Sequence, residues 1–187
     1  SVGPNVFVSQ HLGDLETGEA YRAFERTIES FRALYEADVE VVACDAHPDY
    51  LSSGYARRAG RPVAEVQHHV AHVLACMAEN EIDAPVLGVA WDGTGFGPDG
   101  TVWGGEAFAV EAGGIRRAAS FRSFPLPGGD RAVREPRRSA LGLLHEAVGA
   151  DRLAARLPAG AFEAREAALL AQMIQRGVNS PRTTSAG

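Results

Sequence analysis

The sequence predicts an α/β fold with a largely parallel sheet, followed by a helical lobe. In the first half, short apolar runs alternate with amphipathic segments, an order that is typical of strands and helices stacked in layers. After residue 125 the composition becomes rich in Ala, Arg, Glu and Leu, which favours helices. We therefore expect residues 1–125 to form an α/β subdomain and residues 126–187 to form a helical lobe.

Composition and charge narrow the class of protein. The 187 residues are 45% hydrophobic and 22% charged, as in an ordinary soluble protein, and only two are cysteines. The formal net charge of −6 argues against a general nucleic-acid binder, which needs a basic surface. No apolar run is long enough to cross a membrane, so we expect a cytoplasmic protein. The start without Met and the polar last residues suggest a truncated piece of a longer protein.

The expected elements follow from apolar spacing and from turn residues. Thr17 is expected to cap the first helix, and a stripe of apolar residues along that helix is most simply a core face. Beyond residue 100, two strands flank the Gly113-Gly114 turn. The expected strands are 5–9, 39–44, 62–66, 84–91, 101–110 and 115–121, and the expected helices are 17–37, 49–59, 68–81, 130–149, 151–156 and 161–176.

The strongest chemical signal is a group of histidines at the start of the third helix. His68 and His72 are four residues apart, so a helix places them on one face where both rings can reach one ion. His69 lies about 100 degrees aside and is less suited to the same ion. Imidazole suits zinc or ferrous iron. The alternative is a solvated, histidine-rich helix start without a metal.

A third ligand is expected from the end of the following strand. Asp92 is the nearest acidic candidate in the sequence, and a catalytic ion usually has three protein ligands with one open position. In a layered α/β fold, ligands gather beyond the carboxyl ends of the strands, where Asp92 is expected. Its alternative role is to anchor the glycine-rich loop that follows it. The remaining ligand can also come from beyond residue 187.

That loop, residues 92–100, indicates a phosphate-binding turn. Glycine lets backbone N–H groups face an anion and lets a ligand approach closely. The loop is neither a Walker A motif nor a dinucleotide fingerprint, so the signal is weak by itself. Glu106 has two alternative roles: it is either a polar residue of a strand or a residue that supports the site from behind. The nucleotide-binding candidates are Asp92, Gly93, Thr94, Gly95, Gly97, Gly104 and Gly105.

Five ordered motifs together resemble the HypF family, the carbamoyltransferases of [NiFe]-hydrogenase maturation. They are CDAHPDYLS (44–52), VQHHVAH (66–72), DGTGFGPDG (92–100), WGGE (103–106) and PLPGGD (125–130). Wider relatives are the tRNA threonylcarbamoyl-adenosine enzymes and the antibiotic O-carbamoyltransferases, which share the actin-like ATPase fold. The resemblance thus implies part of an actin-like, ribonuclease H-like domain with a mixed sheet.

The resemblance also implies a reaction. It is the transfer of a carbamoyl group from carbamoyl-adenylate, which is made from carbamoyl phosphate and ATP, to the C-terminal cysteine of the acceptor HypE. The group then becomes a cyanide ligand of the hydrogenase. The family's metal ligands map onto His68, His72 and Asp92, and a further acidic ligand lies beyond residue 187. An actin-like fold closes its nucleotide cleft with a second lobe, much of which is missing here, so we expect the fragment alone to fold but to bind metal and nucleotide weakly and to be inactive. The alternatives are an O-carbamoyltransferase, a tRNA threonylcarbamoyl-type relative, or a non-catalytic fragment that docks a partner.

Overall fold

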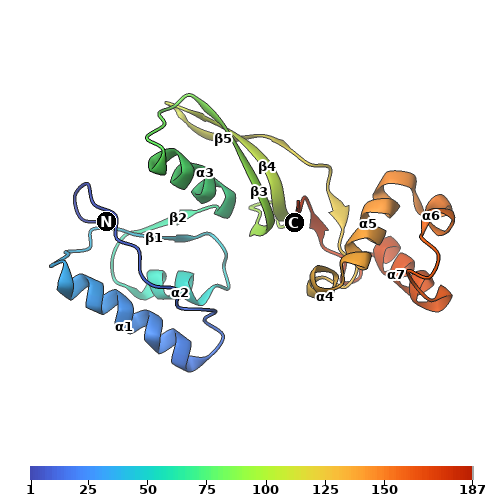
Figure 1. Ribbon diagram of the computed structural model, residues 1–187, viewed down its shortest axis with the longest axis horizontal. Coiled ribbons are helices and arrows are strands. Elements are labelled where there is room, and N and C mark those ends of the chain that lie inside the picture. The colour runs from blue at the N-terminus through green and yellow to red at the C-terminus, as the bar shows by residue number, and fades with distance from the viewer. Residues whose placement is uncertain (187) are drawn as a thin grey trace. The chain divides into compact units, whose positions relative to one another are not determined.

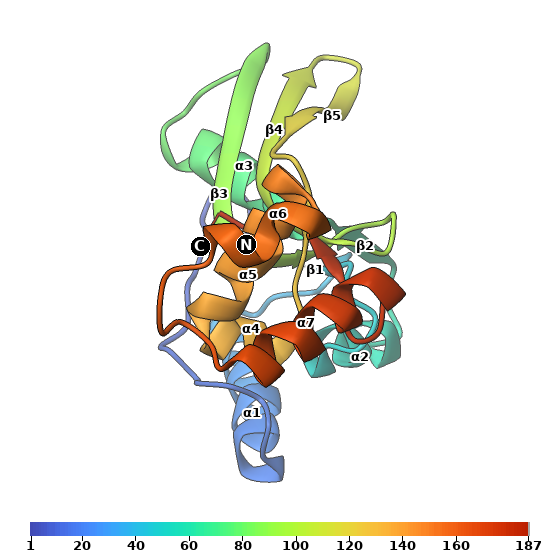
Figure 2. The ribbon, with the colours of Figure 1, turned by 90° about the vertical axis from the view of Figure 1, so that its right-hand side faces the viewer.

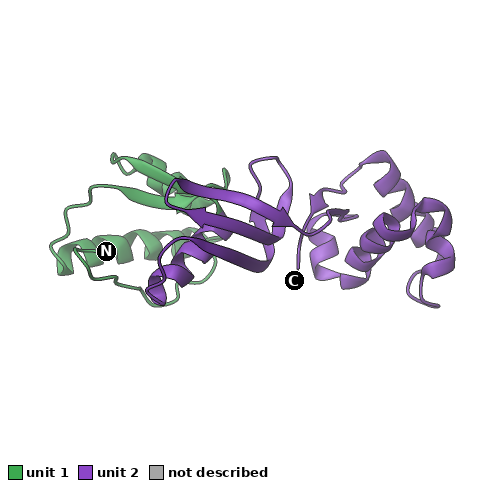
Figure 3. Cartoon of the chain, turned by 90° about the horizontal axis from the view of Figure 1, so that it is seen from above, with its two compact units in different colours: residues 1–67 green, residues 68–187 purple. Residues whose placement is uncertain are grey.

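A computed structural model of the protein describes residues 1–186. The chain divides into two compact units, residues 1–67 and the residues from 68 onward (Figure 3). The boundary that we expected between residues 125 and 126 lies inside the second unit, and it stays a prediction. Among residues 1–186, no helix is both long and apolar enough to cross a membrane.

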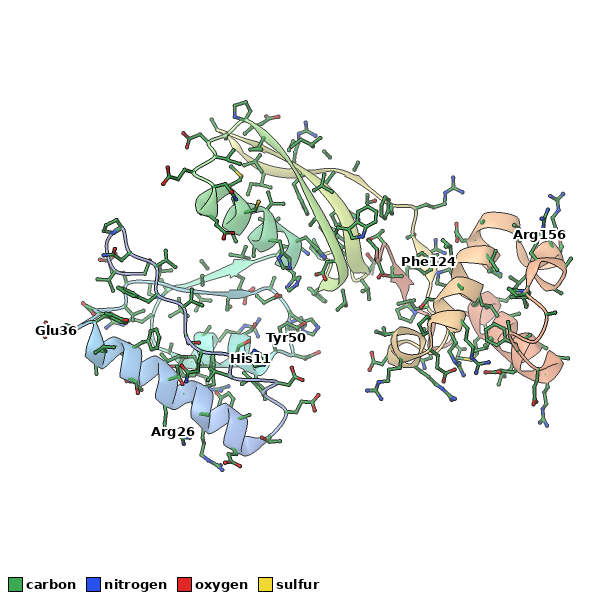
Figure 4. All side chains as sticks on the ribbon, in the orientation of Figure 1. His11, Arg26, Glu36, Tyr50, Phe124 and Arg156 are labelled. Atoms are coloured by element: carbon green, nitrogen blue, oxygen red, sulfur yellow. The ribbon has the colours of Figure 1, made fainter. Side chains whose placement is uncertain are left out.

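The first unit contains two helices and two short strands. They are α1 (Gly18–Leu34), β1 (Val42–Asp45), α2 (Leu51–Arg58) and β2 (Val63–Val66), and β1 pairs with β2 in parallel (Figure 1). Thr17 caps α1 as expected, because its hydroxyl oxygen accepts a hydrogen bond from the Ala20 N–H at 3.1 Å. Arg26 projects outward from α1 into solvent (Figure 4).

The expected strand over residues 5–9 is wrong. The described residues there have only an isolated bridge between Val2 and Asn5, and the Val6 and Val8 side chains are 77% and 86% exposed. An apolar run becomes a buried strand only when a neighbouring strand pairs with it. The apolar stripe of α1 is half-buried, and no residue of this helix is fully buried.

The second unit begins with α3 (His68–Glu79) and a five-stranded sheet. Its strands are β3 (Val86–Phe96), β4 (Val102–Glu111), β5 (Gly114–Ser120), β6 (Phe124–Pro125) and β7 (Arg182–Thr183). The order is β3-β4-β7-β6, with β5 also paired to β4. Pairing is antiparallel except for β4 with β7, so the sheet is mixed.

A largely parallel sheet was therefore the wrong expectation. The connections from β3 to β4 and from β4 to β5 are short turns, and short turns can join only antiparallel neighbours. On one face of this sheet, α3 packs Val73 against Ala90, Phe108 and Val110. On the other face, Leu87, Val89 and Trp91 of β3 stay 65–68% exposed.

Four helices lie between β6 and β7, and three of them share a separate core. They are α4 (Asp130–Arg134), α5 (Pro136–Val148), α6 (Ala150–Arg156) and α7 (Ala164–Arg176), and they group together in Figure 2. Leu141 of α5, Leu153 of α6 and Leu170 of α7 form that core, whereas Ala132 of α4 packs with Phe124 and Leu126. The expected helix over 130–149 is broken at Pro136, because proline has no N–H to donate and restricts the backbone before it. Arg138 is buried between the carboxylates of Glu135 and Glu166.

Candidate metal centre

A bulge in β3 sets the position of Asp92. Trp91 pairs with Gly105, whereas Gly95 pairs with Trp103, so β3 contains two more residues than β4 between these pairs. Such bulges bend a strand and re-aim a side chain. Residues 92–96 are therefore strand and not the loop that we expected, and the turn to β4 lies at residues 97–101.

The histidines occupy the first two turns of α3. His69 and Val73, four residues apart, are both buried on the side of the helix that faces the sheet. The His68 and His72 side chains are 31% and 57% exposed. Both side chains of this pair therefore lie away from the helix face that packs against the sheet. The sequence indicated that His69 is less suited to be a ligand than His68 and His72. It did not reveal that the His69 ring is fully buried and faces Asp92.

The imidazole rings converge on one carboxylate oxygen. The Oδ2 atom of Asp92 lies 3.2 Å from Nε2 of His68, 3.5 Å from Nε2 of His69 and 3.7 Å from Nε2 of His72. The Nε2 atoms of His68 and His72 are 3.2 Å apart. The structure thus brings together His68, His72 and Asp92, whose potential ligand atoms lie within 4.8 Å of one another.

These separations fit the ligand atoms of a single metal ion. With metal–ligand bonds of about 2.0–2.2 Å, two ligands of a tetrahedral ion lie about 3.3–3.6 Å apart. The Oδ2 atom is buried, and no residue among 1–186 donates a hydrogen bond to it. Two imidazole nitrogens and one carboxylate oxygen are a donor set that suits zinc or ferrous iron.

The rest of Asp92 is held by the backbone. Its Oδ1 atom accepts a hydrogen bond from the Gly93 N–H at 2.7 Å, and its carbonyl oxygen accepts one from the Ala186 N–H at 3.0 Å. Because Oδ1 is already bonded, the side chain presents Oδ2 to the histidines. Burial lowers the pKa of His69 below its usual 6.5, although the charge of Asp92 acts in the opposite direction.

The glycines around the bulge have a structural role of their own. A Cβ atom added at Gly95 would lie 2.4 Å from Cε1 of His69, and one at Gly97 would lie 2.3 Å from Nε1 of Trp103. At Gly104 it would meet the Asp92 carbonyl oxygen at 2.6 Å, and at Gly105 it would overlap the Phe121 ring. Close internal packing requires glycine at these four positions, whereas Gly93 faces open space.

The backbone N–H groups of these glycines are already used within the chain. The Gly97 N–H donates to the Thr101 carbonyl, and the Gly104 and Gly105 N–H groups donate to the side chain and the carbonyl of Thr184. The Gly93 N–H donates to Asp92. A phosphate cradle built from these N–H groups would require the chain to rearrange. Among the nucleotide-binding candidates, Thr94 is exposed and Gly93 beside it is half-buried, so this pair is accessible.

Glu106 forms a buried network next to the site. Its fully buried carboxylate accepts hydrogen bonds from Nε of Arg117 at 2.6 Å and from the Thr184 hydroxyl group. The Arg117 guanidinium lies over the Trp103 ring, 3.8 Å from its centroid. The network ties residues 183–186 to β4, and Ala186 in turn bonds Asp92. The only sequence signal for this network was a glutamate within an expected strand. One of the partners of Glu106, Thr184, is 78 residues away in the sequence and could not be identified from it.

Two family models match the chain. One, described as the HypF Kae1-like domain, matches residues 1–79. The other, described as the carbamoyltransferase Kae1-like domain, second subdomain, matches residues 88–187. The chain is 46% identical over 146 residues to carbamoyltransferase HypF of Synechocystis, covering 78% of this chain and 19% of that protein. It is 40% identical over 185 residues to HypF of Rhizobium leguminosarum, covering 99% and 24%.

Solved structures give the same assignment. A crystal structure of full-length HypF in a phosphate- and nucleotide-bound form matches with a TM-score of 0.84 and 37% identity, over 97% of this chain and 24% of that one. HypF of T. kodakarensis matches with a TM-score of 0.82 and 30% identity, over 95% and 25%. The chain spans about a fifth to a quarter of these relatives. It belongs to the HypF carbamoyltransferase family and has the fold of that family's actin-like, Kae1-like domain.

Proposed function

We propose that this chain is the segment of a cytoplasmic carbamoyltransferase that moves a carbamoyl group from carbamoyl-adenylate to an acceptor thiolate. The acceptor is the C-terminal cysteine of a HypE-like protein, on the route to the cyanide ligands of [NiFe] hydrogenase. The observation that carries the proposal is the convergence of His68, His72 and Asp92 in a chain of this family.

In this proposal, His68, His72 and Asp92 hold one zinc or iron ion. Their ligand atoms have separations suited to one ion, and the buried Oδ2 of Asp92 has no hydrogen-bond donor among the described residues. When bound, the ion supplies a Lewis acid for the carbamoyl carbonyl oxygen.

The chemistry needs no nucleophile from this chain. Carbamoyl-adenylate is a mixed anhydride, so it is already activated. The acceptor thiolate attacks the carbamoyl carbon, a C–S bond forms, and the bond from that carbon to the phosphate oxygen breaks, so that AMP leaves with the electron pair. The chain must hold the substrate, orient its carbonyl group and exclude water.

The nucleotide is proposed to lie beside Gly93 and Thr94. A HypF relative has been crystallised with phosphate and nucleotide bound, which supports a nucleotide site in this family. Gly93 has open space beside its Cα atom and Thr94 is exposed, whereas Gly95, Gly97, Gly104 and Gly105 are packed against the chain's own atoms. These four glycines act by shaping the site around Asp92.

The test is an acceptor mass-shift assay on the longer protein that carries this segment. The protein is incubated with carbamoyl phosphate, ATP and a panel of acceptors: a HypE-like protein, an aminoglycoside and tRNA. We expect the mass of one carbamoyl group on the HypE-like protein only, and its loss in His72→Ala. Modification of the aminoglycoside or the tRNA would indicate the corresponding relative instead. A HypE-like protein that binds equally well to His72→Ala but is never modified would indicate a docking fragment.

Metal content gives an independent measurement. Elemental analysis of the same purified protein is expected to find about one zinc or iron per chain, and His68→Ala and His72→Ala are expected to lose it. Thr27→Ala, which changes a hydroxyl in the first unit, is a control that should retain the metal. A metal-free but active unmodified protein would contradict the metal role while leaving the transferase assignment intact.

A further inference from the structure

His69 occupies a special place beside the candidate ligands. Its side chain is fully buried, whereas the His68 and His72 side chains are 31% and 57% exposed. All three nevertheless aim Nε2 at the same Oδ2 atom of Asp92, and the His69 nitrogen is 3.5 Å from it. His68 and His72 therefore meet this oxygen from the side of solvent, and His69 meets it from the protein interior.

The His69 ring is confined by the bulge of β3. The Cα atom of Gly95 is so close to the ring that a Cβ atom there would lie 2.4 Å from Cε1 and 3.0 Å from Nδ1 of His69. The ring also lies edge-on to His68, with centroids 5.4 Å apart. Since both Gly95 and His69 are buried, the ring has little room to turn away from Asp92.

We propose that His69 is a positioning residue that fixes the Asp92 carboxylate, through Nε2, for metal binding by Asp92, His68 and His72. The proposal rests on the metal role given above. A carboxylate with Oδ1 bonded to the Gly93 N–H can still rotate Oδ2 away from the histidines. A contact on the buried side of Oδ2 opposes that rotation. A movement of about half an ångström would bring the two atoms to ordinary hydrogen-bond length.

His69 is not itself a third imidazole ligand in this arrangement. The centroid of its ring is 6.4 Å from that of His72, compared with 4.8 Å between His68 and His72. Groups that hold a metal ligand from behind typically change metal affinity by about 10- to 100-fold when they are removed. A loss of metal affinity of that size is expected for a positioning residue, whereas a residue that only fills the core would affect stability and leave metal affinity nearly unchanged.

Two substitutions of similar size test the role of Nε2. His69→Leu removes the nitrogen and keeps an apolar group of comparable volume, whereas His69→Gln keeps an N–H group near the position of Nε2. Zinc affinity of the longer protein that carries this segment is measured by competition with a chromophoric chelator, and the urea midpoint of the metal-free protein is measured in parallel. We expect His69→Leu to lose about 10- to 100-fold in affinity. His69→Gln should bind zinc more tightly than His69→Leu and recover most of that loss. This difference in affinity is expected even if the metal-free forms of the two variants have equal urea midpoints.

The outcomes separate this inference from the proposed function. If the unmodified longer protein and its His72→Ala variant bind zinc equally, the metal role itself is wrong. If His72→Ala loses zinc but His69→Leu binds as the unmodified chain does, only the positioning role is wrong. The positioning role is also refuted if His69→Leu and His69→Gln lose the same affinity, because the nitrogen then makes no difference.

A measurement on the unmodified chain avoids the risk that the variants do not fold. The histidine nitrogens are labelled with ¹⁵N and cadmium-113 replaces zinc. We expect metal–nitrogen coupling at His68 and His72, and at His69 a shift of the Nε2 resonance without coupling. Coupling at His69 would make it a ligand, and an unchanged Nε2 resonance would mean that it does not sense Asp92. Either result would overturn the proposal.

Discussion

Gly95 offers the sharpest test of how the bulge in β3 supports the site. In Gly95→Ala the new methyl carbon would lie 2.4 Å from Cε1 of His69 and 3.0 Å from the Cβ atom of His68. Favourable contacts between carbon atoms are about 3.5–4.0 Å long. The overlap with His69 is therefore more than about 1 Å, and it falls on a buried ring that packs against a buried backbone.

Such an overlap must be relieved by moving the ring or the strand. Overpacking of this kind costs about 1–3 kcal/mol in a well-packed region. In a protein of this size, each kcal/mol lowers the melting temperature by about 2–4 °C. We expect metal-free Gly95→Ala to lose about 1–3 kcal/mol of unfolding free energy. We also expect weaker zinc binding, because the displaced ring is the one that faces Asp92.

Gly93→Ala is the matched control, since it makes the same chemical change two residues away. A Cβ atom at Gly93 meets nothing within 4 Å, and we expect a change within about 0.5 kcal/mol. Urea unfolding followed by circular dichroism gives both free energies. If the two variants are equally stable, the backbone of Gly95 does not lie as close to the His69 ring as described. The inferred confinement of the His69 ring is then refuted as well.

The remaining predictions concern the helices after the sheet. Leu141→Ala should cost about 2–5 kcal/mol in urea unfolding because Leu141 is fully buried, whereas Leu143→Ala, at a 52% exposed position, should change little; equal losses would contradict the core assigned to α5. Hydrogen bonds from Arg138, and next from Arg131, lower the pKa of Glu135 from 4.5 to about 2. A carboxyl with a lowered folded pKa stabilises the fold fully above pH 4.5, and that contribution is lost as the pH falls toward 2. Glu135→Gln should thus flatten the decline of stability in this window, and an unchanged slope would show that these hydrogen bonds do not persist in solution.

The positions of the helices followed closely from local sequence. The three helices before residue 80 were predicted to within a few residues of their observed ends, because apolar spacing and Thr17 are local signals. Strand pairing was harder. Residues 5–9 have the apolar pattern of a strand but are not one among the described residues, and the sheet of the second unit is mainly antiparallel. A strand depends on a partner elsewhere in the chain, which its own pattern does not reveal.

The site shows the same division. The four-residue spacing of His68 and His72 put them on one helix face, and the expectation of Asp92 as their neighbour agrees with its place in the structure. The glycine motif was explained less well. It predicted a loop that binds phosphate, but most of its glycines let the chain's own side chains and backbone approach closely. Sequence patterns indicate that a backbone is crowded, but they do not say which atoms crowd it.

The sequence by itself determined the three helices before residue 80, the face that carries His68 and His72, and the resemblance to the HypF family. These features depend on residue identity and short-range spacing, which a chain carries before it folds. Only the tertiary structure decided that His69 is buried behind Asp92 and that Gly95 gives its ring space. It also decided that Glu106 binds Thr184 and Arg117. Each of these contacts joins segments that a bulge, a sheet register and a returning strand bring together, so it exists only once the chain is folded.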